Sequence, residues 1–187
     1  MSACNQSTED NSHKRARRDY IVKILSRGLL AVYLVILIWL VLFKLQYDIL
    51  SVFNYNHRSL NLNPFAAPLK LNGSINFGEM INNFIIFIPF GMLINVNYKR
   101  VGFLPKFTMI LGFSLTAELI QFIFAIGATD IIDVITNTVG GILGLKLYSF
   151  SNKYISSIVL DRVIIAFGTL LLVFLLYYRI FILRLIY

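Results

Sequence analysis

Three carboxylates and two amides lie within one apolar stretch of this chain, AELIQFIFAIGATDIIDVITNTVGGILG at residues 117–144. They belong to Glu118, Gln121, Asp130, Asp133 and Asn137. A carboxylate at the centre of a membrane helix costs ~2.5–3.5 kcal/mol even on the lenient insertion scale, so such residues are candidates for a functional site. Together they could bind a polar ligand, hold Mg²⁺ beside substrate phosphates, or relay protons.

Histidine and cysteine chemistry is excluded from this stretch. The chain has one cysteine, Cys4, and two histidines, His13 and His57, and none of them falls in an apolar block. A single cysteine forms neither an internal disulfide nor a cysteine-based metal centre. We therefore expect a protein that needs no nucleophile and no cofactor, with Mg²⁺ entering only if the carboxylates serve an enzyme.

The elements that position these residues must be membrane helices. Of 187 residues, 58% are hydrophobic and 14% are charged, against about 45–50% and about 25% in soluble domains. We expect an all-α integral membrane protein, in which residues 1–19 form a disordered, basic cytoplasmic tail and residues 20–187 form a single transmembrane domain. The run HKRARR precedes an apolar block, which indicates membrane topology rather than nucleic-acid binding.

Five segments reach the ~20 mainly apolar residues that a membrane-spanning helix needs. They are residues 28–47, 78–97, 107–126, 130–150 and 163–181. Within the second segment, Pro89 and Gly91 predict a kink or a break, because proline removes a backbone hydrogen bond and clashes with the preceding turn. Such a break is tolerated where neighbouring helices satisfy the freed backbone groups.

The basic residues predict the orientation of the chain. Most of the 17 lysines and arginines precede the first span or lie in the loops after the second and fourth spans. Loops rich in lysine and arginine face the cytoplasm, so the N-terminus is predicted to be cytoplasmic and the loop at residues 48–77 extracellular. That loop carries Arg58 and several aromatic residues, which suit a segment in the outer interface. A passive linker is the alternative.

The fourth span presents polar residues and glycines on one face. Successive members are three or four residues apart and therefore form one stripe along a helix: Asp130, Asp133, Asn137, Gly140 and Gly144. Gly141 lies at the edge of this stripe. Small residues let a second helix approach closely, so the stripe is expected to face protein rather than lipid.

The third and fourth spans are predicted to form a hairpin that turns at the sequence IGATD. Equal distances from the turn bring Glu118 level with Asn137 and Gln121 close to Asp133, while Asn83 enters from the outer end of the second span. We predict that these residues converge on a polar pocket open to the outside. The alternative is structural, because asparagine and glutamine often only join helices through hydrogen bonds worth ~0.6–2 kcal/mol.

Four motifs resemble the successive signatures of the VanZ family: SLNLNPF, NNFIIFIPFG, AELIQF and DIIDVITNTVGGILG. The resemblance covers residues 24–173 and leaves the N-terminal tail outside it. The recurrent polar positions of the family carry over to Asn83, Glu118, Gln121, Asp130, Asp133, Asn137 and Gly141, with Arg58, Asn61, Pro64 and Phe65 in the outer loop. Many members have an arginine in the hairpin turn, where this chain has GATD. If that arginine meets a substrate anion, this chain must use Arg58 or Lys70 instead, or it lacks the activity.

The resemblance implies a multi-pass protein of the bacterial cytoplasmic membrane that confers low-level resistance to teicoplanin, a glycopeptide antibiotic. It also implies that the protein is not one of the enzymes that remake the peptidoglycan terminus. A non-enzymatic pocket could engage a lipid-linked cell-wall precursor or exclude the lipid tail of teicoplanin from the outer leaflet. Two alternatives stay open: a membrane-embedded, metal-assisted enzyme that modifies a lipid head group, and a cation-coupled carrier. The oligomeric state is open as well.

Overall fold

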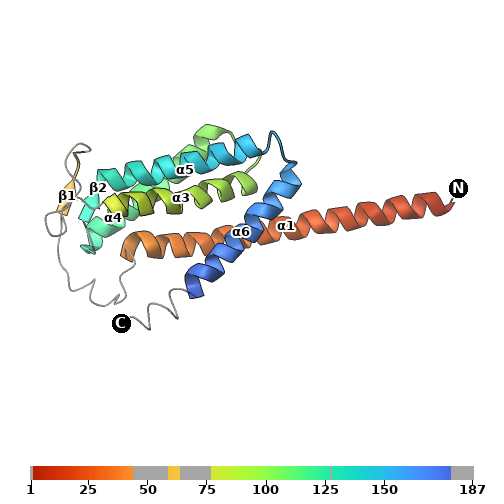
Figure 1. The fold of residues 1–187 in the computed structure, drawn as a ribbon, viewed down its shortest axis with the longest axis horizontal. Coiled ribbons are helices and arrows are strands. Elements are labelled where there is room, and N and C mark those ends of the chain that lie inside the picture. Colours follow the sequence, from red (N-terminus) through yellow and green to blue (C-terminus); the bar gives the residue numbers. More distant parts are fainter. Residues whose placement is uncertain (1, 44–58, 64–76, 127, 178–187) are drawn as a thin grey trace.

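The computed structural model describes residues 2–43, 59–63, 77–126 and 128–177. These residues form helices and one two-stranded parallel sheet. In chain order the elements are α1 (Ser2–Phe43), β1 (Ser59–Asn61), α3 (Phe77–Asn97), α4 (Phe103–Phe124), β2 (Ala128–Asp130), α5 (Ile131–Ser151) and α6 (Ser157–Tyr177). Figure 1 shows α1, α3, α4 and α5 running roughly along one direction, with α6 packed obliquely against α1.

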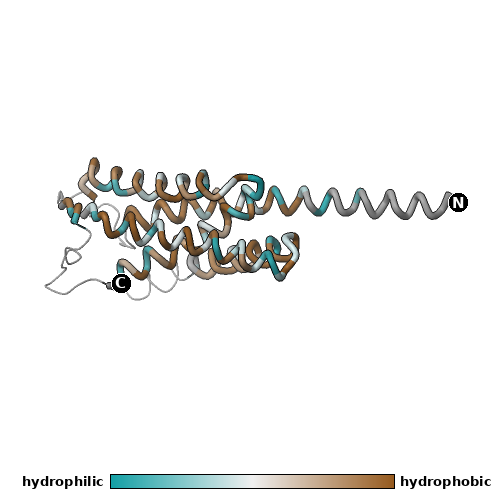
Figure 2. Tube along the Cα trace, turned by 90° about the horizontal axis from the view of Figure 1, so that it is seen from above, coloured by the Kyte–Doolittle hydropathy of each residue, from teal (hydrophilic) through white to brown (hydrophobic). Residues whose placement is uncertain are grey.

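Five helices contain a segment long and apolar enough to cross a membrane. The segments are Tyr20–Leu42, Gly78–Asn97, Phe103–Phe124, Ile131–Ser151 and Ser157–Phe174. The prediction of an all-α membrane protein with about five spans is confirmed. Figure 2 shows hydrophobic residues along the length of the bundle, and many large apolar side chains on the outside of the helices are exposed, as a lipid-facing surface requires.

The N-terminal segment differs from the prediction. Residues 2–19 were expected to be disordered, but α1 begins at Ser2 and continues into the first span without interruption. No proline or glycine occurs before Gly28, so nothing in the local sequence stops a helix that the membrane segment stabilises. Figure 1 shows this part of α1 projecting beyond the other helices.

The third and fifth spans begin earlier than their apolar runs indicated, and each includes a charged residue that its run left out. α4 begins at Phe103 and includes Lys106, and α6 begins at Ser157 and includes Asp161. A charged residue lowers the hydropathy of a window and so shortens a predicted span. Both side chains are buried and bonded inside the protein, so neither faces lipid.

Glycines allow α5 to lie directly against α3. A Cβ atom at Gly140 would stand 2.2 Å from the carbonyl oxygen of Phe84, and one at Gly144 would stand 2.1 Å from the carbonyl oxygen of Ile88. No side chain fits at either distance, so the two backbones are in contact along this stripe. Close approach through small residues is how membrane helices associate without a hydrophobic driving force between them.

The second span contributes a glycine to the same contact. A Cβ atom at Gly91 would stand 2.0 Å from the carbonyl oxygen of Gly141, whose own missing side chain leaves room for Ile110 of α4. α3 continues through Pro89 as one helix, so the break considered from the sequence is not present. The kink stays a prediction.

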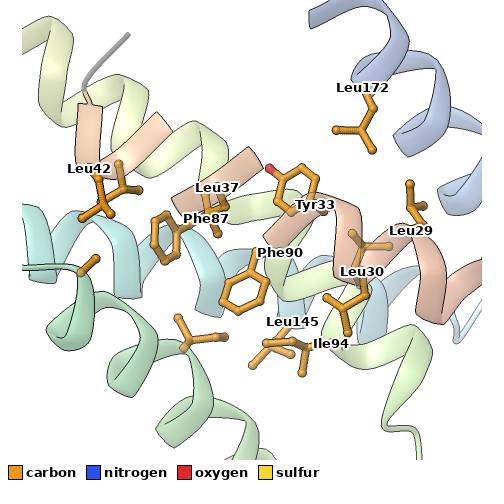
Figure 3. Packing of buried hydrophobic residues seen from close by; sticks show 14 of the residues in the cluster. Leu29, Leu30, Tyr33, Leu37, Leu42, Phe87, Phe90, Ile94, Leu145 and Leu172 are labelled. Atoms are coloured by element: carbon orange, nitrogen blue, oxygen red, sulfur yellow. The ribbon is translucent and has the colours of Figure 1, made fainter. Parts of the chain in front are cut away.

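The apolar core lies where α1, α3 and α4 meet. Leu37, Phe87 and Ile110 are completely buried there, and Figure 3 shows Phe87 and Phe90 beneath the helix that carries Leu37. The rings of Phe87 and Phe90 meet edge to face at 5.8 Å, which is a favourable aromatic geometry. This core fixes α4 against α1 and α3, and so positions the polar residues of α4.

The sheet joins the loop before α3 to the hairpin between α4 and α5. β1 pairs in parallel with β2, with Asn61 opposite Asp130. Most of the long loop predicted to be extracellular lies outside the described residues, and β1 is the part that the structure places.

Candidate functional site

The end of α4, the start of α5, the two strands and the start of α3 lie at one end of the bundle (Figure 1), and four acidic residues belong to these elements. We call this the acidic end of the bundle, and its acids are Glu79, Glu118, Asp130 and Asp133. The N-terminus of a helix favours negative charge because its backbone N–H groups are unpaired and its dipole is positive there. The start of α5 therefore explains why carboxylates can be retained at this place.

Asp130 is the N-cap of α5. Its Oδ1 accepts a hydrogen bond from the backbone N–H of Ile132 at 2.9 Å. Nδ2 of Asn61 donates to both oxygens of the same carboxylate, at 3.2 Å each. The side chain is 7% exposed. Asp130 thus caps α5 and binds β1 at the same time.

Glu118 reaches the same point from α4. Its Oε2 accepts a hydrogen bond from the backbone N–H of Asp130 at 3.1 Å, and the residue is 4% exposed. The hydroxyl of Thr129 donates to the carbonyl oxygen of Glu118 at 3.4 Å. Asp133, in the first turn of α5, is 5% exposed. The three carboxylates are therefore buried around the beginning of one helix.

A symmetric hairpin predicted that Asn137 would lie level with Glu118, and the structure places it beside Ser114 instead. Its Nδ2 donates to Oγ of Ser114 at 3.0 Å, and both residues are fully buried. Glu118 meets Asp130 instead. The reason is the connection: Ala125 adopts a left-handed conformation and α5 begins only at Ile131, so the turn is longer and less symmetric than a simple helical hairpin.

Gln121 makes a contact that the sequence did not indicate. Its Nε2 donates to the backbone carbonyl oxygen of Val41 on α1 at 2.9 Å, in a fully buried position. It was predicted to lie close to Asp133. The observed bond joins α4 to α1, which is the structural role considered as the alternative for amide side chains.

Three buried polar atoms near this network have no hydrogen-bond partner among the described residues: Oε1 of Gln121, Oδ1 of Asn137 and Oγ1 of Thr138. An unpaired buried polar group costs ~1–3 kcal/mol. Such atoms in a folded protein call for water, an ion or a ligand group. A hydrogen-bond donor that reaches these three oxygen atoms would remove this cost.

Of the remaining residues predicted for the site, the structure describes Asn83 but not those in the long loop before α3. Asn83 is buried in the first half of α3, at 9% exposure. Arg58, Pro64, Phe65 and Lys70 lie outside the described residues. Within the described ranges, no three acidic, histidine or cysteine side chains are grouped closely enough to hold a metal ion.

Sequence reasoning missed Ser114, which pairs with Asn137. Its position did carry a signal, because Ser114, Glu118 and Gln121 are spaced by four and three residues and so share one face of α4. The serine was overlooked because a hydroxyl in an apolar helix is cheap and common.

A protein-family model described as VanZ/LLP1 matches residues 30–152. Protein VanZ from Enterococcus faecium is 71% identical over 157 residues, which cover 84% of this chain and 94% of that protein. No solved structure matches the fold.

Proposed function

The chain belongs to the VanZ/LLP1 family, and we propose that it confers low-level resistance to teicoplanin from the bacterial cytoplasmic membrane by a route that does not hydrolyse the antibiotic. The resemblance of its motifs to the VanZ family supports the resistance, and its helices support the multi-pass membrane location.

The observation that carries the proposal is the burial of Glu118, Asp130 and Asp133 at one end of a membrane bundle. Helix capping explains Asp130, which bonds the backbone N–H of Ile132. It does not require a second carboxylate from α4 at the same place. A membrane helix that keeps Glu118 despite the insertion cost of a carboxylate has, by default, a use for the charge.

The chemistry at the acidic end favours a ligand rich in hydrogen-bond donors. Carboxylate and amide oxygens accept hydrogen bonds, and those of Gln121 and Asn137 are unpaired among the described residues. Hydroxyl and amide groups of a wall precursor or of a glycopeptide can donate to them. An anionic pyrophosphate would instead be repelled by the carboxylates, so we place the sugar and peptide part of a lipid-linked precursor, rather than its phosphates, at this end.

Entry to the site is proposed from the outer surface, past the contact between β1 and β2. Asn61 is only half-buried there and holds the Asp130 carboxylate. The predicted extracellular orientation of the preceding loop would put this contact in the outer leaflet, where both wall precursors and the lipid tail of teicoplanin are found.

Expression of this chain alone in a teicoplanin-susceptible host tests the function. The inhibitory concentration of teicoplanin should rise above that of the empty-vector host, and mass spectrometry should recover the antibiotic intact from the medium. The matched variants are Asp133→Asn and Asp161→Asn, which neutralise a buried carboxylate at the acidic end and at the opposite end. No rise with the wild-type chain, or degraded teicoplanin, would contradict the proposal, and dependence of the protection on added Mg²⁺ would favour the enzymatic alternative.

A further inference from the structure

A second polar region lies at the end of the bundle opposite to the acidic end, where α3 ends, α4 begins and α5 ends. A cavity of about 280 Å³ opens there. Its polar lining consists of Asn95, Lys106, Lys146, Ser149 and Lys153. Three lysines from two helices and the turn after α5 therefore surround one cavity, and none of the described residues that line it is acidic.

Lys106 is the unusual member of this group. It is 6% exposed, and its ammonium donates to Oδ1 of Asn95. Asn95 is held in turn, because its Nδ2 donates to the carbonyl oxygen of Leu145 at 2.8 Å and to Oγ of Ser149 at 3.4 Å. A buried cation is costly unless it is paired and hydrogen-bonded. The contact described for Lys106 is to a neutral amide, so a negative charge in the cavity would complete its pairing.

Another lysine at this end of the bundle, Lys99, has a negatively charged partner within the protein. Its ammonium forms an ion pair with Asp161, whose other oxygen accepts a hydrogen bond from the hydroxyl of Tyr148 at 2.7 Å. No such carboxylate lines the cavity of Lys106 within the described residues. Lys99 is thus neutralised by a carboxylate of the protein, whereas the positive charge of Lys106 is left for a ligand.

The apolar part of the lining indicates where the ligand comes from. Phe103 and Phe150 also line the cavity, and they are 54% and 59% exposed. Both lie close to the ends of membrane-spanning helices. Exposed phenylalanine rings at the ends of membrane helices can pack against lipid acyl chains. A soluble anion would have no use for these rings, whereas a phospholipid brings acyl chains next to its phosphate.

We infer that this cavity binds the phosphate group of an anionic phospholipid. Basic pockets between membrane helices on the cytoplasmic side bind anionic head groups, and the basic residues of the chain predict that this end is cytoplasmic. The ammonium of Lys106 would meet the phosphate from inside the cavity. Lys146 and Lys153, which are exposed at its rim, would meet it from the surface. This inference is independent of the function proposed for the acidic end.

The test uses the purified full chain in a neutral detergent, with native mass spectrometry as the readout. Phosphatidylglycerol is titrated against phosphatidylcholine with the same acyl chains, and inorganic phosphate serves as a competitor. The variant Lys146→Gln/Lys153→Gln leaves the buried Lys106 untouched. Arg17→Gln/Arg18→Gln removes the same charge from exposed positions of α1, away from the cavity.

One phosphatidylglycerol should bind in preference to phosphatidylcholine, and Lys146→Gln/Lys153→Gln should weaken it by about 30-fold, as expected for two lysines near a charged head group. The arginine variant should bind about as well as wild type. Equal affinity for both lipids would overturn the inference. So would equal loss in the two double variants, which indicates diffuse attraction, or full displacement by inorganic phosphate, which indicates a site for a free anion.

Discussion

The Oε2 atom of Glu118 accepts a hydrogen bond from the backbone N–H of Asp130 at 3.1 Å. The carboxylate of Asp130 in turn accepts hydrogen bonds from Asn61 and from the first turn of α5. Three segments distant in the sequence are thus joined through two buried carboxylates. Loss of the Asp130 carboxylate removes the bonds to Asn61 and to the first turn of α5, and loss of the Glu118 carboxylate removes the bond between α4 and the hairpin.

The Asn61→Ala variant should loosen β1 from the hairpin between α4 and α5. It removes two hydrogen bonds to a carboxylate, and a hydrogen bond to a charged group contributes ~1.5–3 kcal/mol. The midpoint of thermal unfolding in detergent should fall. Leu62→Ala is the control, because Leu62 is the next residue and is 68% exposed. An equal midpoint for the two variants would contradict the role given to Asn61.

The Gly144→Ala variant should destabilise the contact between α3 and α5. The new Cβ atom would stand 2.1 Å from a backbone oxygen of Ile88, so the helices would have to separate, and overpacking of this kind costs ~1–3 kcal/mol. Gly112→Ala offers a matched control in α4, because nothing lies within 4 Å of a Cβ atom there. We expect a lower unfolding midpoint only for Gly144→Ala. A similar fall of the midpoint in both variants would show that any substitution of a helix glycine destabilises the chain. It would contradict the specific role given to Gly144 in the contact between α3 and α5.

The Ser114→Ala variant should destabilise the contact between α4 and α5. It leaves Nδ2 of Asn137 without its buried partner, at a cost of ~1–3 kcal/mol. The hydroxyl of the exposed Thr116, two residues away, donates to the carbonyl oxygen of Gly112 in its own helix, so Thr116→Ala controls for the loss of a hydroxyl. Thermal unfolding followed by circular dichroism should give a lower midpoint for Ser114→Ala than for Thr116→Ala. A fall for Thr116→Ala that matches the fall for Ser114→Ala speaks against the pairing.

The Tyr148→Phe variant should lower the unfolding midpoint of the protein but leave resistance to teicoplanin unchanged. It removes the hydroxyl that donates to Asp161 at 2.7 Å, and hydrogen bonds to charged groups contribute ~1.5–3 kcal/mol. Tyr154→Phe is its control, since Tyr154 is 76% exposed. At equal membrane abundance, both variants should protect the host like wild type. Loss of protection with Tyr148→Phe alone would move the functional site away from the acidic end.

The sequence predicted the spans and the polar stripe because both depend on local patterns. Apolar runs of membrane length define the helices, and glycines three and seven residues after Asn137 indicate a close helix contact. The register of the hairpin could not be predicted in the same way. It depends on the left-handed conformation of Ala125 and on the strand that follows, and neither has an apolar or periodic signature.

The buried charges at the opposite end were missed for a related reason. Lys106 and Asp161 fell just outside the predicted third and fifth spans, because a hydropathy average treats every charge as exposed to lipid. In the structure, Lys106 bonds Asn95 and Asp161 bonds Lys99 and Tyr148. These partners come from α3, from the turn after it and from α5, so only the tertiary structure shows that both charged groups are hydrogen-bonded inside the protein and that the spans extend past them.

The most direct test of the role of the acidic end is the teicoplanin inhibitory concentration of a susceptible host that expresses Glu118→Gln or Asp161→Asn at the same membrane abundance as the wild-type chain. Both changes keep the size of a buried carboxylate side chain and remove its charge, at opposite ends of the bundle. We predict that Glu118→Gln reduces protection to that of the empty vector and that Asp161→Asn retains it. Full protection with Glu118→Gln would contradict the account.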